Sequence, residues 1–189
     1  MSNAQPSRTT KRALAAAAVL GTCLLAATTM PRFDVNAERK IVAHYPNGDT
    51  LFEVTAKDNK WDGDFVYYHR IGLVSQAGSY KNGKKHGNWK TWDILDGDSH
   101  TESEGAFVSG NEEGQWTFYS SATEKSEQGM MRKGKRTGIW KEWWPNGKQK
   151  SEGAYDEDEE RTGDWKVWTE DGEIDLEESG KYQNGTRIN

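Results

Sequence analysis

Residues 78–92 read Gly78-Ser-Tyr80-Lys-Asn-Gly83-Lys-Lys-His-Gly87-Asn-Trp89-Lys-Thr-Trp92. Two glycines lie in the middle of this stretch, where the chain can take positive φ and reverse its direction. Short aromatic segments precede and follow them, and aromatic residues favour strands. The stretch therefore predicts a β-hairpin, with Gly78–Tyr80 in the first strand and Asn88–Trp92 in the returning strand.

This hairpin pattern is repeated along the chain. The returning strand, Gly-x-aromatic-x-x-aromatic, occurs five times, and its glycines are spaced by 24, 27, 24 and 25 residues. Turns such as Pro145-Asn-Gly147 connect one hairpin to the next. We therefore expect an all-β fold, an open, single-sheet antiparallel meander of repeated β-hairpins in which each hairpin packs only against its neighbours.

The five returning strands define two columns of rings. The first column holds the first ring of each copy: Phe65, Trp89, Trp116, Trp140 and Trp165. The second column holds the last ring of each copy: Tyr68, Trp92, Tyr119, Trp143 and Trp168. Because side chains alternate along a strand, either each face of the sheet carries one column or a bulge turns the second ring.

The two columns differ in how uniform they are. The first is nearly all tryptophan, and a chain with so little Ile, Leu and Val needs its rings as core, so we expect the first column to be the stacking core. The second column also contains tyrosine, which is easiest to place where its hydroxyl reaches water. We therefore expect the second column to border a partner-binding face.

These residues resemble the MORN repeat, in the bacterial variant found in YwqK-type antitoxins, whose units read Gly-x-Tyr-x-x-Gly-x-x-x-Gly-x-Trp-x-x-Tyr/Trp followed by Asn-Gly. The resemblance covers about residues 45–189, and residues 105–119 fit the pattern throughout. The first unit lacks the leading glycine, and Asp156–Glu160 replaces the central glycine of a later one. The resemblance implies a curved hairpin sheet used for protein association or, in some eukaryotic relatives, lipid binding, and the antitoxin label implies inhibition of a toxin.

Composition and charge limit the possible partners. Only 33% of the residues are hydrophobic, but nine Trp, seven Tyr and five Phe argue against a disordered chain. Four of the 25 basic side chains and none of the 30 acidic ones precede residue 34, so the remainder carries a net charge of −9. Because such a domain repels phosphate groups and anionic lipids, we expect no nucleic-acid partner and membrane contact only through the N-terminal segment.

Residues 1–33 are predicted to be a signal peptide or a signal anchor with an apolar helix. Three basic residues precede the apolar run Ala13–Ala27, which predicts repeats that are secreted, periplasmic or anchored with the repeats outside the cytoplasm. Lipidation at Cys23 is a further alternative. Residues 34–44 are predicted to be a linker and residues 45–189 the repeat domain.

The sequence offers no catalytic, cofactor or metal-binding constellation, so we expect no enzyme, no cofactor and no metal site. The acidic run Asp156–Glu160 lacks the spacing of a calcium loop and is expected to be a solvated turn. The histidines occupy different positions of the repeat and are expected to be exposed in loops: His44, His69, His86 and His100.

The repeat glycines are expected to differ from ordinary loop glycines. Valine at Gly114 should strain the backbone or the packing. Valine at Gly97, in the irregular loop that makes one spacing 27 residues long, should cost little.

Three functions remain for a repeat protein of this kind. The first is a non-enzymatic scaffold for protein–protein interaction, because repeat arrays present extended faces and Trp and Tyr dominate interface energies. The second is a carbohydrate or cell-wall binding module, which would carry coplanar exposed indoles beside polar side chains. The third is an antitoxin-like inhibitor, which conflicts with the export signal unless the partner toxin acts outside the membrane.

Overall fold

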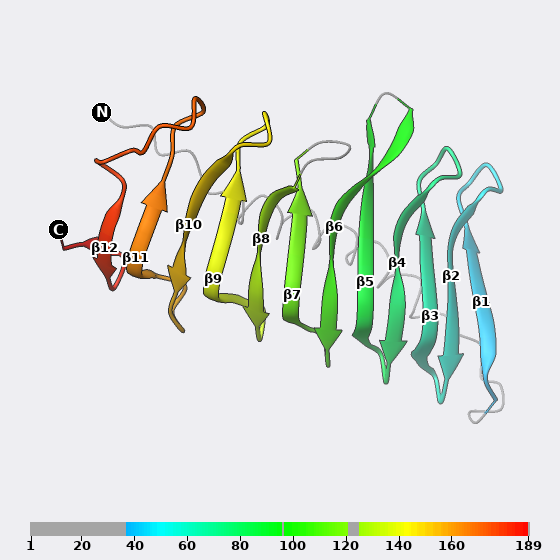
Figure 1. Ribbon diagram of the computed structural model, residues 1–189. Coiled ribbons are helices and arrows are strands. Elements are labelled where there is room, and N and C mark those ends of the chain that lie inside the picture. Colours follow the sequence, from blue (N-terminus) through cyan, green and yellow to red (C-terminus); the bar gives the residue numbers. More distant parts are fainter. Residues whose placement is uncertain (1–36, 96, 121–124, 189) are drawn as a thin grey trace, which may run out of the picture. The chain divides into compact units, whose positions relative to one another are not determined.

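The computed structural model describes residues 37–95, 97–120 and 125–188, which form one sheet of 13 strands (Figure 1). Each strand pairs with its neighbours in sequence, and all of the pairs are antiparallel. The all-β, open, single-sheet meander predicted from the hairpin repeat is therefore confirmed. The predicted apolar helix in residues 1–33 lies outside the described residues.

The first strand and the returning strand of successive hairpins alternate across the sheet. In chain order the strands are β1 (Arg39–His44), β2 (Thr50–Lys57), β3 (Lys60–Tyr68), β4 (Val74–Lys81), β5 (Lys84–Leu95), β6 (Asp98–Val108), β7 (Asn111–Tyr119), β8 (Lys125–Arg132), β9 (Lys135–Trp143), β10 (Gln149–Tyr155), β11 (Arg161–Val167), β12 (Gly180–Gln183) and β13 (Thr186–Arg187).

The sheet begins inside the segment 34–44 that the sequence predicts to be a linker, because residues 39–44 form β1. Ile41 is the register partner of Val54, and Ala43 is the register partner of Phe52. A strand without the ring motif thus still places apolar side chains opposite the apolar residues of β2, and this pairing explains why the linker prediction is wrong for β1.

The first column forms the core, as the sequence predicts. Each of its five rings is between 1% and 4% exposed: Phe65, Trp89, Trp116, Trp140 and Trp165. They lie on one face of the sheet, which we call the core face. A nearly continuous series of ring contacts runs along this face, for example from Phe65 to Trp89 at 5.6 Å between centroids.

Each tryptophan of the first column lies over a glycine of the preceding strand. A Cβ atom at any of these glycines would overlap the indole, and the four pairs are Gly78 with Trp89, Gly105 with Trp116, Gly129 with Trp140 and Gly153 with Trp165. Each indole Nε1 also donates a hydrogen bond of 3.0–3.1 Å to the carbonyl of the residue after that glycine: Ser79, Ala106, Met130 or Ala154. Glycine is required at these positions by close approach of the ring.

The first hairpin shows the same contact with different residues. At the position of the covered glycine it has Val54, which is 1% exposed, and at the position of the tryptophan it has Phe65. A side chain larger than glycine therefore occurs together with a ring smaller than indole. This exchange keeps the combined volume within the limits that a close-packed core tolerates.

Each returning strand has a residue two positions before the glycine of its motif, which we call the wedge residue: Trp61, Lys85, Glu112, Arg136 and Arg161. All of them except Glu112 lie against the ring of their own hairpin and the next ring along the core face. Lys85 Nζ lies 4.0 Å from the centroid of Trp89 and 5.0 Å from that of Phe107. Arg136 bridges Trp140 and Tyr155 in the same way, with Cζ at 4.7 Å and 5.5 Å from the two centroids. Cations are attracted to ring faces, so these side chains stabilise adjacent hairpins against each other.

The loop glycine and the repeat glycine have similar backbone conformations. Gly114 has a φ of +77° and Gly97 a φ of +86°. The expectation that Gly97 accepts valine at little cost is therefore wrong, because the turn between β5 and β6 also places its glycine in the left-handed region.

Candidate binding face

The second column lies on the face opposite the core, which we call the outer face. Lys90 and Glu104 flank Trp89 and Gly105 in their strands and therefore point away from the core face. The Tyr119 hydroxyl donates a hydrogen bond of 2.8 Å to Glu104 Oε1, and Lys90 Nζ lies 5.7 Å from the ring centroid of Trp92. The strand pairing shifts register just before Tyr68, Trp92 and Tyr119, yet Trp92 and Tyr119 contact side chains of the outer face. Of the two arrangements that the sequence leaves open, the structure thus has these second rings on the face opposite the first column.

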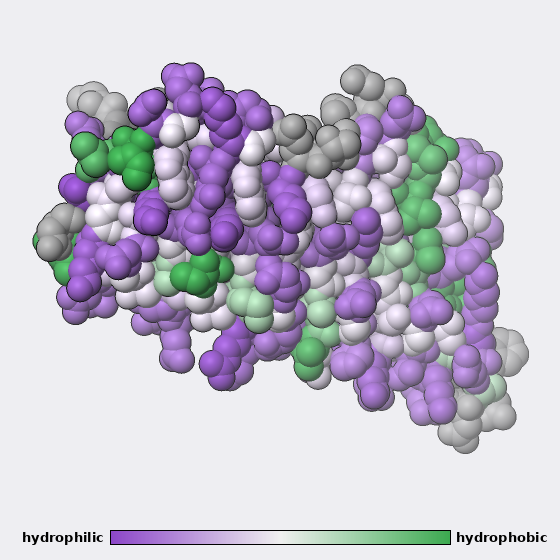
Figure 2. Space-filling view, in the orientation of Figure 1, coloured by the Kyte–Doolittle hydropathy of each residue, from purple (hydrophilic) through white to green (hydrophobic). Residues whose placement is uncertain are grey.

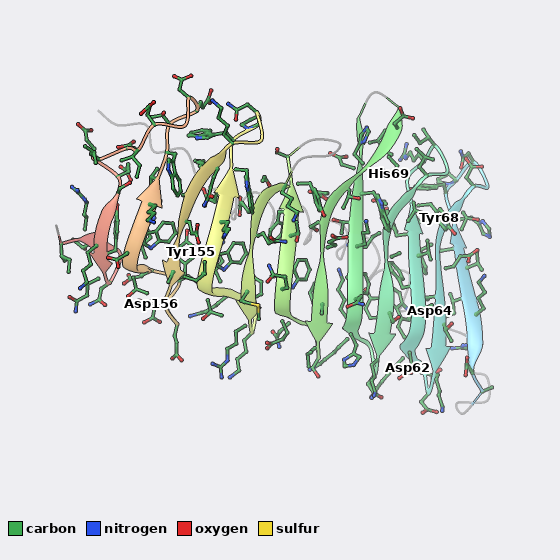
Figure 3. The ribbon with its side chains drawn as sticks, in the orientation of Figure 1. Asp62, Asp64, Tyr68, His69, Tyr155 and Asp156 are labelled. Carbon is green, nitrogen blue, oxygen red and sulfur yellow. The ribbon has the colours of Figure 1, made fainter. Side chains whose placement is uncertain are left out.

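All five rings of the second column are partly exposed. They lie at the ends of the returning strands, as Figure 3 shows for Tyr68, which is far from Asp62 at the other end of β3. Trp168 follows the last residue of β11 and forms an isolated bridge with Ile174. The fold thus brings these rings to the same end of successive hairpins.

Side chains of the connecting turns bind the backbone beside the second column. The acceptor is the carbonyl of a second-column residue in the next hairpin, and the three contacts are Tyr45 Oη to Tyr68 O at 2.8 Å, His69 Nε2 to Trp92 O at 3.3 Å and Trp144 Nε1 to Trp168 O at 3.0 Å. These contacts span 23 or 24 residues, so they fix each hairpin end relative to the next. A surface whose backbone is held in this way is preorganised for binding.

Three Lys–Glu ion pairs join neighbouring strands on the outer face. The pairs are Lys40 with Glu53 at 2.7 Å, Lys90 with Glu104 at 3.2 Å and Lys141 with Glu152 at 3.5 Å. Between the last two pairs, Gln128 Nε2 donates a hydrogen bond of 2.9 Å to Thr117 Oγ1. This row of side chains therefore adds no net charge to the outer face.

The contact between Tyr119 and Glu104 fixes the protonation of both groups. The hydrogen bond from Tyr119, together with Lys90, lowers the pKa of Glu104 below its usual range. Burial and the hydrogen bond to Glu104 raise the pKa of Tyr119 to about 12. At neutral pH the pair is a carboxylate that accepts from a neutral phenol.

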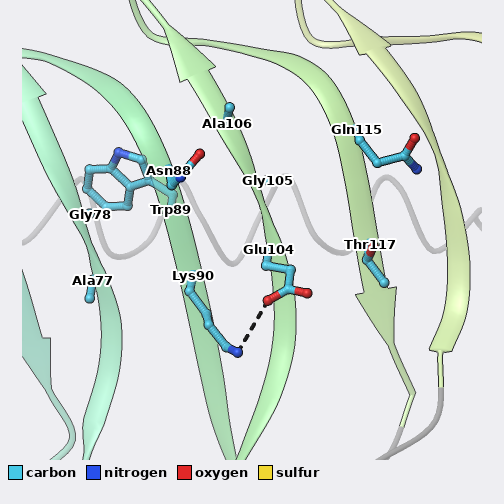
Figure 4. A pocket seen from close by; sticks show the side chains of 10 residues that line it. All are labelled: Ala77, Gly78, Asn88, Trp89, Lys90, Glu104, Gly105, Ala106, Gln115 and Thr117. Carbon is cyan, nitrogen blue, oxygen red and sulfur yellow. Dashed lines mark ion pairs between the residues drawn. The ribbon is translucent and has the colours of Figure 1, made fainter.

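A shallow hollow of about 700 Å³ opens on the outer face across β4, β5, β6 and β7 (Figure 4). Its floor contains Ala77 and Ala106 beside glycine backbone, and the ion pair between Lys90 and Glu104 crosses it. The remaining residues that line it are Gly78, Asn88, Trp89, Gly105, Gln115 and Thr117.

Two apolar side chains are exposed on the two strands that follow the hollow, and the first of them, Met130, is the register partner of Gln115, which lines it. Met130 on β8 is 44% exposed, and Ile139 on β9 is 55% exposed. Both flank buried core residues, Met131 and Trp140, in their strands and therefore lie on the outer face. Figure 2 shows small apolar areas over β8 and β9 and a longer apolar area near β3.

The core face carries one pair of titratable wedge residues. Burial lowers the pKa of the Lys85 ammonium to about 8, although Glu112 nearby favours its charged form. Burial raises the pKa of Glu112, which Lys85 opposes. The rings that contact Lys85 also favour the cation. Lys85 and Glu112 lie on the face that holds the first column, so they contribute to packing between hairpins.

The histidines and the acidic turn differ in part from the predictions. Three of the histidines lie in strands, because His44 is in β1, His86 in β5 and His100 in β6, so the prediction that they are loop residues is wrong for these three. The acidic turn is exposed at residues 157–160, but it is also bonded to the preceding hairpin. Glu159 Oε1 accepts a hydrogen bond of 2.9 Å from the backbone N–H of Arg136.

Within the described ranges, no group of three or more His, Cys, Asp and Glu residues is placed to hold a metal ion. The same part of the chain has no helix that is long and apolar enough to cross a bilayer. No protein-family model matches the chain, and a search of curated proteins finds no significant match.

The sequence identifies the second column but not its surroundings. The hollow depends on two alanines, and the apolar border depends on Met130 and Ile139, which occupy positions that the repeat leaves free. Side-chain alternation could have identified these residues from the sequence, because any residue next to a first-column tryptophan or a covered glycine must face the opposite side of the sheet.

Proposed function

We propose that the sheet is a MORN-like array that acts as a non-enzymatic scaffold for protein–protein interaction. The observation that carries this proposal is the placement of the second column. Tyr68, Trp92 and Tyr119 are partly exposed and contact or approach charged side chains of the outer face, whereas the first column is buried on the other side. Partly exposed Trp and Tyr on a rigid surface are the residues that most often dominate binding energy at interfaces.

An open sheet supports binding better than catalysis. The hollow is shallow and lies on an extended face, and its one ion pair is an ordinary Lys–Glu pair across two strands. Catalytic groups generally act in enclosed sites where the protein excludes water. We therefore propose a binding role with no reaction step, and we place the repeats outside the cytoplasm, with residues 1–33 as the export signal or anchor.

The experiment compares two double variants of the full chain. Tyr119→Ala with Trp143→Ala removes two rings of the second column, and Asp64→Ala with Asp164→Ala removes two exposed polar side chains of the same face that do not line the hollow. Both variants and the wild type are used for affinity capture from the native envelope, and bound proteins are quantified by mass spectrometry. We expect the ring variant to lose the captured partner while its melting temperature stays close to that of wild type, and the polar variant to retain it.

Equal capture by all three proteins would contradict a role of the second column. Capture lost only in proportion to a lower folded fraction would show that these rings are needed for stability instead. Circular dichroism on the same samples separates the two cases, because it reports the folded fraction directly.

A carbohydrate or cell-wall binding module is the second candidate. The observation in its favour is that Trp92 has polar neighbours, since Lys90 lies over its ring and forms an ion pair with Glu104. Titration with soluble peptidoglycan fragments, followed by tryptophan fluorescence, tests this candidate. A saturable change that Trp92→Ala abolishes would favour it over the protein scaffold. An antitoxin-like role has only the resemblance to the repeat family in its support.

A further inference from the structure

We propose that the hollow on the outer face receives one uncharged side chain of the protein partner, and that Met130 and Ile139 form the apolar border of this contact. The inference rests on the proposed scaffold function and assigns the contact to a particular place on the outer face. It concerns only β4 to β9, although the second column extends along the whole array.

The hollow exists because two repeat positions carry small residues. The residue before each covered glycine is Ala77 in β4, but Glu104, Gln128 and Glu152 in the later hairpins. The residue after the covered glycine is Ala106 in β6 and Ala154 in β10, but Met130 in β8. The space is therefore specific to the combination of Ala77 with Ala106, since the hairpin before Ala154 has Gln128 at the position of Ala77.

The charges around the hollow favour an uncharged occupant. Lys90 and Glu104 lie 3.2 Å apart, and Glu104 also accepts the hydroxyl of Tyr119, so both charged groups already have partners. A charged side chain placed here would lose hydration and displace one of these contacts. An uncharged side chain meets the floor of Ala77 and Ala106, while the exposed amides of Asn88 and Gln115 remain available to polar backbone groups of the partner.

The border of the hollow favours a protein over a saccharide. Met130 and Ile139 are 44% and 55% exposed and offer no hydrogen-bonding groups to a sugar hydroxyl. Methionine and aromatic residues are enriched in the cores of protein interfaces, and the side chains that contribute most usually fill a pocket on the partner surface. The hollow, its apolar border and the neighbouring ring of Tyr119 together match such an arrangement.

The first step of the test identifies the protein that touches the hollow. A photo-crosslinking amino acid replaces Gln115 at the hollow, or Asp164 as the matched control, because each residue directly precedes a first-column tryptophan. A third position, Trp143, probes the second column away from the hollow. The full chain is expressed in its native envelope and irradiated, and the crosslinked protein is identified and purified. We expect a discrete adduct from positions 115 and 143 and a much weaker one from position 164.

The second step fills the hollow. Ala106→Met introduces the residue that the next hairpin has at the equivalent position, Met130, so the sheet should accept it. Ala154→Met makes the same change at the equivalent position of a hairpin outside the hollow. The affinity of the purified full chain for the crosslinked protein is measured by calorimetry. We expect Ala106→Met to weaken binding by about tenfold or more with an unchanged melting temperature, and Ala154→Met to bind as wild type does.

Each failure of the inference can be distinguished from failure of the scaffold function. Adducts from position 143 but not from position 115, or wild-type affinity of Ala106→Met, would overturn the assignment to the hollow and leave the scaffold function standing. Absence of protein adducts from both positions would overturn both. Binding of soluble peptidoglycan fragments that Ala106→Met abolishes would overturn the proposal in favour of a saccharide site.

Discussion

A methyl group added at Gly105 should destabilise the sheet more than the same group added at Gly114. A Cβ at Gly105 would overlap the indole of Trp116, whereas a Cβ at Gly114 meets no atom within 4 Å. The two positions belong to the same hairpin, and a substitution destabilises the sheet for a different reason at each of them. Gly105→Ala tests the close approach of the ring, and Gly114→Ala tests the left-handed backbone, since Gly114 has a φ of +77°.

The expected costs follow from these two contacts. Forcing Trp116 away from the strand is an overpacking defect of about 1–3 kcal/mol. The displaced indole also loses its hydrogen bond of 3.1 Å to Ala106 O, which adds about 0.5–1.5 kcal/mol. Gly105→Ala should therefore lower the free energy of unfolding by about 2–4 kcal/mol. Gly114→Ala should cost only about 1–2 kcal/mol, the usual penalty of a left-handed L-residue.

The first hairpin indicates how the larger defect can be relieved, because Val54 and Phe65 occupy the two positions there. Trp116→Phe in the Gly105→Ala background should recover part of the loss, with a favourable coupling of about 1 kcal/mol in a double-mutant cycle. Urea titrations followed by far-UV circular dichroism provide the free energies. The reasoning is refuted if Gly105→Ala costs no more than Gly114→Ala, or if the phenylalanine brings no recovery.

Four further predictions concern the core, its charge, a loop and the topology. Trp116→Ala should lower the free energy of unfolding by about 3–5 kcal/mol in the same urea titrations, because it empties a buried ring site. The pKa of Lys85 is lowered to about 8 in the folded state, so the unfolded state binds more protons between pH 8 and 10.5 and the free energy of unfolding should rise with pH there. Lys85→Met should remove this part of the pH dependence, and equal slopes for the variant and the wild type would contradict the burial of Lys85. Gly97→Val should cost about 1–3 kcal/mol, since the position needs a left-handed backbone, and a thermal shift near zero would be inconsistent with its φ of +86°. A reporter that is active only in the cytoplasm, fused after residue 189, should be silent in cells, and full activity would count against export of the repeats.

The repeat pattern predicts most of the sheet and its core. The glycine spacing and the two rings of each copy define the returning strands, and the buried positions of Trp89, Trp140 and Trp165 agree with the first column. This works because side-chain alternation and hairpin turns are local properties of the chain. The prediction fails at β1, which carries no ring motif and is held by its register with β2.

The surroundings of the outer face could not be predicted in the same way. The hollow arises from side chains of four strands whose residues are as far apart in the sequence as Ala77 and Thr117. Its depth depends on which residues are small at positions that the repeat leaves free. Wedge residues such as Lys85 and Arg136 also escape a search for motifs, because they share a position and not a residue type.

Because the two rings of each motif are three residues apart, one ring stabilises the core and the other is available for recognition. In β5, Trp89 faces the core and Trp92 the outer face, so one short motif supplies a ring to each side. The covered glycine is the same residue in four hairpins because its indole allows nothing larger, whereas the residue after it is Ser79, Ala106, Met130 or Ala154. The outer face can therefore change its shape from hairpin to hairpin without disturbing the ring contacts that stabilise the array. Variation at positions beside the covered glycines should consequently alter binding far more than folding.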